Sequence, residues 1–268
     1  MRYFVKFTYN GTPFHGSQTQ PNGITVQETM EKTFSTILRQ PIALTFAGRT
    51  DAGVHALEMY AHFDYPTSLN AKLLTAKLNS LLPPEIAVYD ILHVHDNAHA
   101  RFAAFWRTYH YRIIDHKDPF NMHFMTCVAP GLDYDKMNEA AQLLLGTHDF
   151  ASFCKVHTDV RTTICTVTEA HWQPISLSPI PLSPILLSPI HQLTDFPIHQ
   201  FTITADRFLR NMVRAIVGTL FAVGRGKLSL TDFQAIIDAK NRCSAGQSAP
   251  SDGLYLVHVE YPKNIFIS

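Results

Sequence analysis

The chain of 268 residues contains few cysteines and no long apolar run. Its four cysteines are Cys127, Cys154, Cys165 and Cys243, and no two of them form a C-x-x-C pair. No uncharged stretch reaches about 18 apolar residues without a proline, so no membrane span is expected. Met1 to Phe7 has the pattern of a strand, and no signal peptide is expected. These absences favour a soluble cytoplasmic protein with free thiols.

Charged residues are also scarce, at 16% of the chain, and they balance. Lys and Arg total 22, as do Asp and Glu, which gives a formal net charge of zero. This balance excludes a protein that holds nucleic acid by its overall positive charge, although a local basic groove remains compatible with it. Hydrophobic residues make up 46% of the chain, which is enough for one large domain or two domains of about 100–150 residues.

Hydrophobic periodicity predicts an α+β protein built from two related halves. The first half reads strand, helix, strand, strand, helix, strand, at 2–9, 26–40, 42–46, 59–63, 71–82 and 86–92. The second reads strand (109–115), helix (133–145), two β-rich runs (162–172 and 199–204), two helices (208–223 and 231–239) and a final strand (254–261). We therefore expect ferredoxin-like or RRM-like halves, 1–104 and 105–268, with mixed, mainly antiparallel sheets and the helices on one side.

The segment 174–198 differs from the rest of the chain. Leu-Ser-Pro-Ile occurs three times at a spacing of five residues, beginning at Leu177, Leu182 and Leu187. So much proline excludes a helix or a central strand. An inert, extended loop is favoured over a ligand for a proline-recognising domain, because the P-x-x-P pattern is common by chance.

The segment from Phe46 to His55 places a carboxylate, Asp51, among small residues directly after a predicted strand. Small residues let a ligand approach the backbone closely, and Arg49 lies two positions away. A reactive carboxylate and a turn in which Asp51 only caps backbone amides are equally compatible with this pattern. A phosphate-binding loop is excluded, because Val54 stands where such a loop needs lysine.

Three other segments carry chemically interesting side chains. Between Arg101 and Arg112 basic and aromatic residues alternate, so that Arg107, Tyr109 and Tyr111 would share one face of a strand. Such a face suits bases and phosphates, but a strand with aromatic core residues and a solvated basic face is an alternative. Arg207, Arg210 and Arg214 would line one face of a helix. His93, His95 and His99 form the best metal-binding candidate, although they match no metallohydrolase motif and a histidine cluster at a strand end is favoured.

Taken together, five blocks resemble the tRNA pseudouridine synthases of the TruA family. The first is the segment from Gly48 to His55. The others, in chain order, are 100–102 with 109–112, 146–153 with 161–162, 208–214 with 217–218, and 253–256. Their order and spacing cover nearly the whole chain.

The resemblance implies an isomerase that converts uridine to pseudouridine in the anticodon stem-loop of tRNA, at positions 38 to 40. It also implies a homodimer without metal or cofactor, whose two sheets join across a central cleft. Position by position, Asp51 matches the catalytic aspartate and Tyr109 the tyrosine that stacks on the target base. Arg214 matches the arginine that pairs with the aspartate, and Arg49 and Arg101 are expected to contact phosphate or order loops.

The chain departs from the family pattern at two short motifs and in the Leu-Ser-Pro-Ile insertion, which is foreign to that pattern. Ser17 stands where the family usually has tryptophan, and Cys154 and Lys155 stand where it often has arginine. Two other hypotheses remain: an RNA-binding protein of the same fold without activity, and a metal hydrolase built on the three histidines. Intact Asp51, Tyr109 and Arg214 favour the isomerase.

Overall fold

The computed structural model describes residues 1–156, 161–175 and 197–267. The first half of the chain forms β1 (Arg2–Tyr9), α1 (Val26–Leu38), β2 (Thr45–Phe46), β3 (His55–Asp64), α2 (Ala71–Leu81) and β4 (Ile86–Val94). The second half forms β5 (Trp106–Ile114), β6 (Thr126–Cys127), α3 (Tyr134–Gln142), β7 (Gly146–Asp149), β8 (Ile164–Ile175), β9 (Ile198–Ala205), α4 (Met212–Gly224), α5 (Leu230–Ala239) and β10 (Leu254–Glu260). The proline-rich insertion predicted at 174–198 lies almost entirely outside the described residues.

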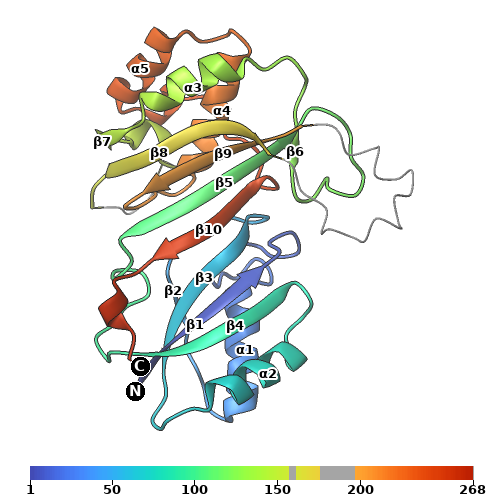
Figure 1. Ribbon diagram of the computed structural model, residues 1–268, viewed down its shortest axis with the longest axis vertical. Helices are drawn as coiled ribbons and strands as arrows, with labels where there is room; N and C mark the ends of the chain where they lie inside the picture. Colours follow the sequence, from blue (N-terminus) through green and yellow to red (C-terminus); the bar gives the residue numbers. More distant parts are fainter. Residues whose placement is uncertain (157–160, 176–196, 268) are drawn as a thin grey trace, which may run out of the picture.

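The strands join into one open sheet in the order β4-β1-β3-β10-β5-β9-β8-β7. Along this path only β3 and β10 are parallel, and every other neighbouring pair is antiparallel. Figure 1 shows α1 and α2 beside the half built on β1, β3 and β4, and the other three helices beside the half built on β8 and β9. The predicted α+β class with a mainly antiparallel sheet is confirmed.

The strand β10 connects the two halves. It pairs with β3 at Tyr255 and Leu256 on one side and with β5 on the other. Two hydrophobic clusters form the core, and Tyr109 of β5 is partly buried and packs against both of them. Val259 and Tyr261, near the end of the chain, belong to the cluster of the first half. The division into 1–104 and 105–268 stays a prediction.

The helices begin where side chains satisfy their free backbone N–H groups. Thr25, Asn70 and Asp133 each accept a hydrogen bond from the third residue after them, as the helix starts predicted from the sequence require. The sequence spaces Thr231 and Gln234 as a capping box, but Ser229 and Asp232 form the box in the structure, so that α5 begins at Leu230 and not at the predicted Thr231.

The predicted start of the apolar helix at Phe208 is also wrong. Asn211 adopts a left-handed conformation with φ 66°, and α4 begins only at Met212. A helix cannot continue through such a residue. Arg207 and Arg210 therefore precede the helix and do not share a face of it with Arg214.

Although α4 is the most apolar helix, none of the described helices is long and apolar enough to cross a membrane.

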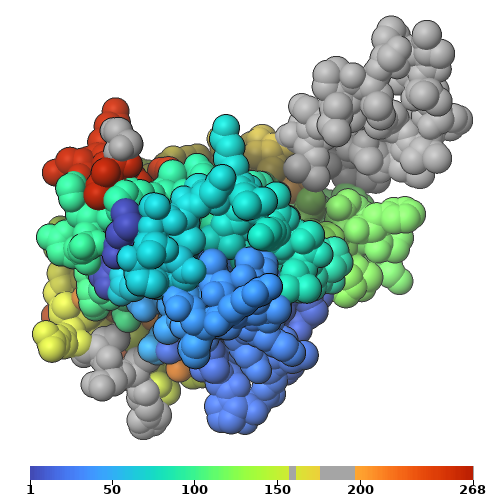
Figure 2. Space-filling model, turned by 90° about the horizontal axis from the view of Figure 1, so that it is seen from below, coloured from blue at the N-terminus to red at the C-terminus, as the bar shows by residue number. Residues whose placement is uncertain are grey.

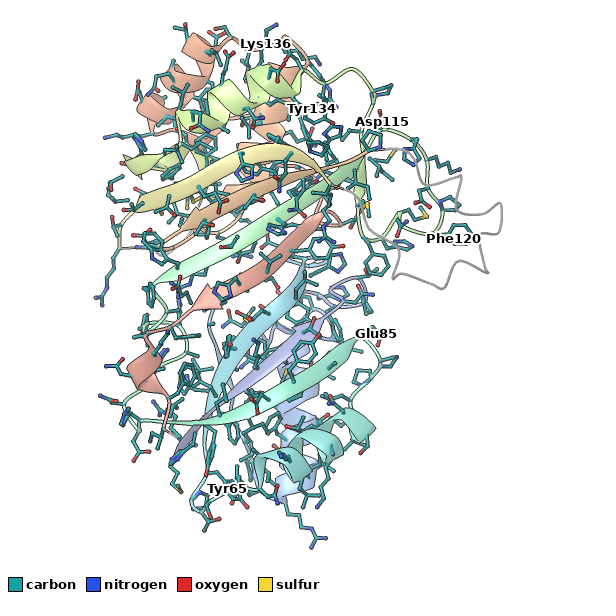
Figure 3. The ribbon with its side chains drawn as sticks, viewed as in Figure 1. Tyr65, Glu85, Asp115, Phe120, Tyr134 and Lys136 are labelled. Carbon is teal, nitrogen blue, oxygen red and sulfur yellow. The ribbon has the colours of Figure 1, made fainter. Side chains whose placement is uncertain are left out.

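The surface of the first half dominates the view from below in Figure 2. The chain between β5 and β6 extends away from both clusters, and Phe120 lies at its outer side in Figure 3. Its side chain is 89% exposed. The labelled residues Tyr134 and Lys136 in the same figure lie on α3, at the far end of the molecule from Tyr65.

Burial keeps two histidines of the sheet neutral. Burial, assisted by the charge of Arg2, lowers the pKa of His62 to about 4. Burial also lowers the pKa of His110 to about 4. The ring of His62 accepts a hydrogen bond from the backbone N–H of Ala100, whereas the buried Nδ1 of His110 has no partner among the described residues. Both rings therefore resist protonation in the folded state.

These two histidines predict a loss of stability in mild acid. The unfolded chain binds their protons near pH 6.5 and the folded chain only near pH 4, so the free energy of unfolding falls as pH drops through this window. We expect calorimetry to show a Tm lower by about 5 °C at pH 4.5 than at pH 7.5. His110→Gln should reduce that difference, and replacement of the exposed His95 by Gln should not. If Tm falls by the same amount between pH 7.5 and pH 4.5 in wild type and in His110→Gln, His110 does not contribute to the loss of stability in acid.

Candidate active site

Asp51 lies in the loop between β2 and β3, and hydrogen bonds fix the residue before it. The backbone N–H of Ser17 donates to the carbonyl oxygen of Thr50 at 3.1 Å, and the N–H of Thr50 donates to the Ser17 hydroxyl at 2.8 Å. The hydroxyls of Tyr9 and Thr50 are 2.8 Å apart. Ser17 is fully buried. The residue that departs from the family pattern thus anchors the Asp51 loop.

Two glycines let the chain after β1 pack directly on this loop. A Cβ atom added to Gly11 would lie 2.0 Å from the carbonyl oxygen of Val54, and one added to Gly16 would lie 2.8 Å from that of Thr50. Gly16 also has φ +93°, a conformation that other residues rarely adopt. The chain that follows β1 therefore packs against the loop of the candidate site.

Each carboxylate oxygen of Asp51 faces a different arginine. The Arg214 guanidinium donates a hydrogen bond to Oδ2 at 3.2 Å, and Nε of Arg210 lies 3.9 Å from Oδ1. The side chains of Asp51 and Arg214 are 29% and 22% exposed, whereas that of Arg210 is 53% exposed. The predicted Asp51–Arg214 pair is present in the structure, and it is half-buried, with a second, outer cation beside it.

Arg214 is held in place by the segment that precedes β10. Its Nε donates to the carbonyl oxygen of Ala249 at 2.7 Å, and the N–H of Ala249 donates back to the carbonyl oxygen of Arg214 at 2.9 Å. One turn further along α4, a Cβ atom on Gly218 would lie only 1.8 Å from the carbonyl oxygen of Gln247. The close contact between helix and segment therefore depends on glycine at 218.

Gly218→Ala is expected to lower the free energy of unfolding by about 2–3 kcal/mol. The added methyl group must push the backbone at Gln247 away, and Ala249 with it, because backbone cannot yield as a flexible side chain can. Urea unfolding measures the loss. Gly48→Ala is the matched control, since no atom lies within 4 Å of the added carbon, and it should stay within about 0.5 kcal/mol of wild type. Equal effects of the two substitutions would show that the helix and the segment separate at little cost.

Tyr109 lies on β5, at the junction of the two hydrophobic clusters. Its ring packs edge-on against Phe208, with centroids 4.9 Å apart. Burial raises the pKa of Tyr109 to about 12; the charge of Arg107 opposes this effect and that of Asp51 adds to it. The side chain is therefore a neutral phenol near the carboxylate. The structure thus brings Asp51, Arg214 and Tyr109 into one region, as the resemblance implies.

The polar groups of Tyr111 and Arg107, on the same strand, are bonded within the protein. Tyr111 is fully buried, and its hydroxyl bonds to Thr126 and to the carbonyl oxygen of Pro250. The Arg107 guanidinium donates to the carbonyl oxygens of Ala104, Asp206 and Arg101. The interpretation that Arg107 and Tyr111 hold RNA is therefore wrong: the first ties loops together and the second belongs to the core.

Arg49 and Arg101 are exposed, and neither forms an ion pair with any residue that the structure describes. Arg49 lies in the same loop as Asp51. The Arg101 guanidinium lies 5.7 Å from the ring centroid of Phe102. Their expected contacts with phosphate stay predictions.

His55 is a residue whose role sequence reasoning missed, although it ends the first block. Its Nδ1 accepts a hydrogen bond from the N–H of Gly11 at 3.1 Å, so Nε2 carries the proton and donates to the carbonyl oxygen of Asp252 at 3.1 Å. Its ring stacks on Tyr255, with centroids 4.7 Å apart. Burial lowers the pKa of His55. A neutral histidine thus links the two halves beside the Asp51 loop.

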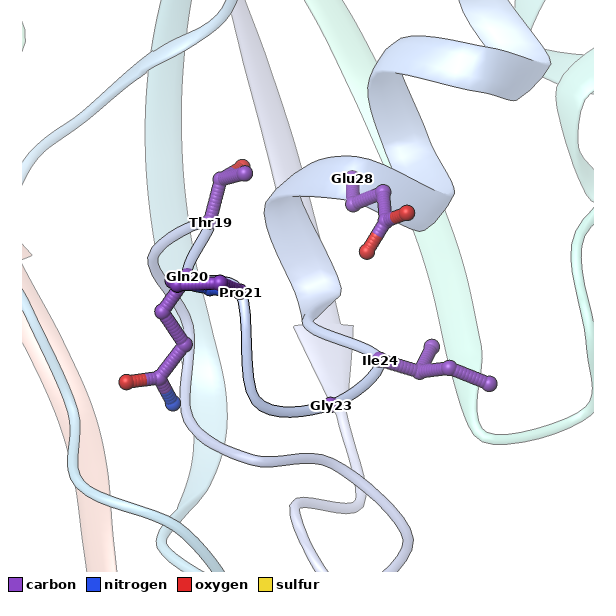
Figure 4. A pocket seen from close by; sticks show the side chains of 6 residues that line it. All are labelled: Thr19, Gln20, Pro21, Gly23, Ile24 and Glu28. Carbon is purple, nitrogen blue, oxygen red and sulfur yellow. The ribbon is translucent and has the colours of Figure 1, made fainter.

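Neither the histidine cluster nor a hollow beside the start of α1 adds to the site. The described residues contain no group of three or more His, Cys, Asp or Glu side chains placed to hold a metal ion, and His99 packs on His62 and Phe102. A hollow of about 480 Å³ beside the start of α1 is lined by Thr19, Gln20, Pro21, Gly23, Ile24 and Glu28 (Figure 4). None of these six is a predicted site residue.

The chain is similar to known proteins over nearly its whole length. A family model described as tRNA pseudouridine synthase matches residues 140–262. The chain is 50% identical over 268 residues to tRNA pseudouridine synthase A of Porphyromonas gingivalis, with 99% of each chain covered. It is 49% identical over 265 residues to that of Bacteroides thetaiotaomicron, with 99% of this chain and 92% of the relative covered. It is 37% identical over 265 residues to that of Bacillus subtilis, with 97% of this chain and 99% of the relative covered.

Proposed function

Since the chain belongs to the tRNA pseudouridine synthase family, we propose that it isomerises uridine in the anticodon stem-loop of tRNA, at positions 38 to 40. The general activity follows from membership: the protein is an isomerase that forms pseudouridine in tRNA. The observation that carries the assignment of the site is the Asp51 carboxylate, paired with Arg214 and close to Tyr109.

The reaction breaks one bond to the ribose and forms another. The bond from N1 of uracil to C1′ breaks, the base turns, and C5 bonds to C1′. The proton on C5 is then lost, and N1 gains one, so that substrate and product have the same composition. Asp51 supplies the reactive carboxylate by attacking C1′, by attacking C6, or by taking the 2′ proton. Each route needs an ionised carboxylate with an oxygen accessible to the substrate, and Asp51 is 29% exposed.

Tyr109 provides a face for the target base. The base must leave the stack to reach a carboxylate in the protein, at a cost of a few kcal/mol. Stacking on an aromatic ring offsets about 1–3 kcal/mol of that cost. The contact of Tyr109 with Phe208 and its packing against both clusters hold the ring in one orientation. A neutral phenol in this place can also relay the C5 proton, taking it up as it passes its own hydroxyl proton to a base.

Arg214 stabilises the carboxylate and orients it. Its Nε is occupied by Ala249, so the guanidinium presents its other edge to Asp51 in a fixed direction. Electrostatic groups that need no rearrangement during the reaction contribute most to rate. By resemblance to the family, we also propose that the enzyme is a homodimer that needs no cofactor and acts in the cytoplasm.

The test is to find where pseudouridine forms. We expect the protein to release tritium from a tRNA transcript labelled at C5 of uridine, and sequencing of the product to place pseudouridine at positions 38 to 40. A transcript with cytidine at those three positions is the control, and it should release none. Continued release from the control would move the modified site elsewhere in tRNA. Tight binding of both transcripts without release would favour an RNA-binding protein without activity.

A further inference from the structure

Arg210 lies 3.9 Å from Asp51 and has no role in the steps above. Sequence reasoning placed it on a helical face with Arg214, but the left-handed Asn211 separates it from α4. Its backbone carbonyl oxygen accepts a hydrogen bond from the N–H of Lys155, so its place in the chain is fixed. Its side chain is 53% exposed. The backbone of Arg210 is therefore fixed, whereas its half-exposed side chain can change rotamer.

The two arginines differ in how firmly they hold Asp51. Arg214 makes a hydrogen bond of 3.2 Å and is anchored by Ala249. Arg210 lies 3.9 Å from the other oxygen, beyond hydrogen-bonding distance, and has no other ion pair among the described residues. Exposed ion pairs of this kind are weak. The outer contact can therefore be exchanged for another anion, while the inner pair remains.

The anion nearest to Asp51 in a bound substrate is a phosphodiester. Asp51 must reach the sugar or base of the target uridine, and phosphates are attached to that same sugar through its 5′ and 3′ oxygens. A guanidinium beside the carboxylate is thus within reach of them, and its planar fork suits phosphate oxygens. Building on the proposed function, we propose that Arg210 leaves Asp51 when RNA binds and holds a phosphodiester that flanks the target uridine.

This exchange has two consequences for the site. It frees Oδ1 of Asp51 for the substrate, while Arg214 keeps its contact with Oδ2. It also makes Arg210 a residue for RNA binding, with little effect on the chemical step. A residue that only balanced the charge of Asp51 would show the opposite pattern, with unchanged affinity and a slower step.

Arg210→Gln separates the two patterns. We expect the Kd for an anticodon stem-loop RNA to rise about tenfold, and the single-turnover rate at saturating enzyme to stay within about threefold of wild type. The slope of log Kd against log salt should fall by about 0.7, the value for one phosphate contact on a single strand. Arg225→Gln removes the same charge at the other end of α4, where the guanidinium lies 5.8 Å from the ring centroid of Phe221, and it should match wild type.

RNA with one neutral methylphosphonate, either 5′ or 3′ of the target uridine, identifies the phosphate. We expect one of the two modified RNAs to bind wild type about tenfold more weakly than unmodified RNA does. The same modified RNA and unmodified RNA should bind Arg210→Gln equally well. Additive losses at both linkages would overturn the proposal, as would unchanged affinity with a slower step. Failure of wild type to modify the stem-loop would refute the proposed function instead. The comparison of Kd between wild type and Arg210→Gln, made with the tRNA that the protein does bind, would still test the phosphate contact of Arg210.

Discussion

Asp51→Asn is expected to abolish pseudouridine formation, with a loss on the order of 10⁴-fold or more, while tRNA binding stays within about twofold of wild type. The substitution keeps the volume of the side chain but removes the charge that every route from Asp51 requires. The loop should keep its shape, because Thr50 is bonded to Ser17 and Tyr9 and the N–H of Val54 donates to the backbone carbonyl oxygen of Asp51, and the substitution leaves these bonds in place. Tritium release and filter binding on the same tRNA measure the two quantities.

Asp135→Asn is the matched control for this experiment. It makes the same chemical change at an exposed position in the first turn of α3. The control should retain wild-type turnover. If Asp51→Asn keeps more than a small fraction of the activity, Asp51 is not the reactive group and the assignment of the site is wrong.

Arg214→Gln should have the second largest effect, a fall in single-turnover rate on the order of 10²–10³-fold, as for the loss of a preorganised electrostatic partner. The stability cost should be smaller than the about 3–5 kcal/mol expected for a fully buried pair. Asp51 and Arg214 are 29% and 22% exposed, so water partly solvates the carboxylate that remains. We expect urea unfolding to show a loss of about 1–2 kcal/mol, screening by solvent included.

Arg214→Lys distinguishes charge from geometry. Lysine keeps the positive charge but cannot bond to Ala249 and Asp51 together through a planar fork. We expect it to recover most of the stability and only part of the rate. Recovery of the full rate would mean that charge alone matters, and an unchanged rate in Arg214→Gln would remove the residue from the mechanism.

Local sequence patterns were sufficient for most elements and failed where a single backbone conformation decided the outcome. Alternation and capping residues predicted the described strands other than the short β6 and β7, and the starts of α1 and α2, because those signals depend on neighbours along the chain. The start of α4 was misplaced by the left-handed Asn211, which nothing in an apolar helical pattern reveals. The same conformation separates Arg210 from Arg214 and places it beside Asp51.

The candidate site could be predicted only as separate residues. The blocks around Asp51, Tyr109 and Arg214 were recognisable by resemblance, whereas the residues that fix them were not. Ser17 appeared as a departure from a pattern, and the structure shows it as the buried anchor of Thr50. His55 appeared as the end of a motif, and the structure shows it bonded to Gly11 and Asp252. Such roles depend on partners that are far away in the sequence.

The sequence by itself determined the α+β class, the order of most elements and the residue types at the site, because these follow from periodicity, caps and short motifs. Only the tertiary structure decided that β10 lies between β3 and β5, and that Asp51 meets an arginine 163 positions further along the chain. The physical reason is that strand pairing and ion pairing are long-range contacts. The sequence pattern of a strand predicts which of its side chains share a face of the sheet. It does not predict which other strand will pair with its backbone.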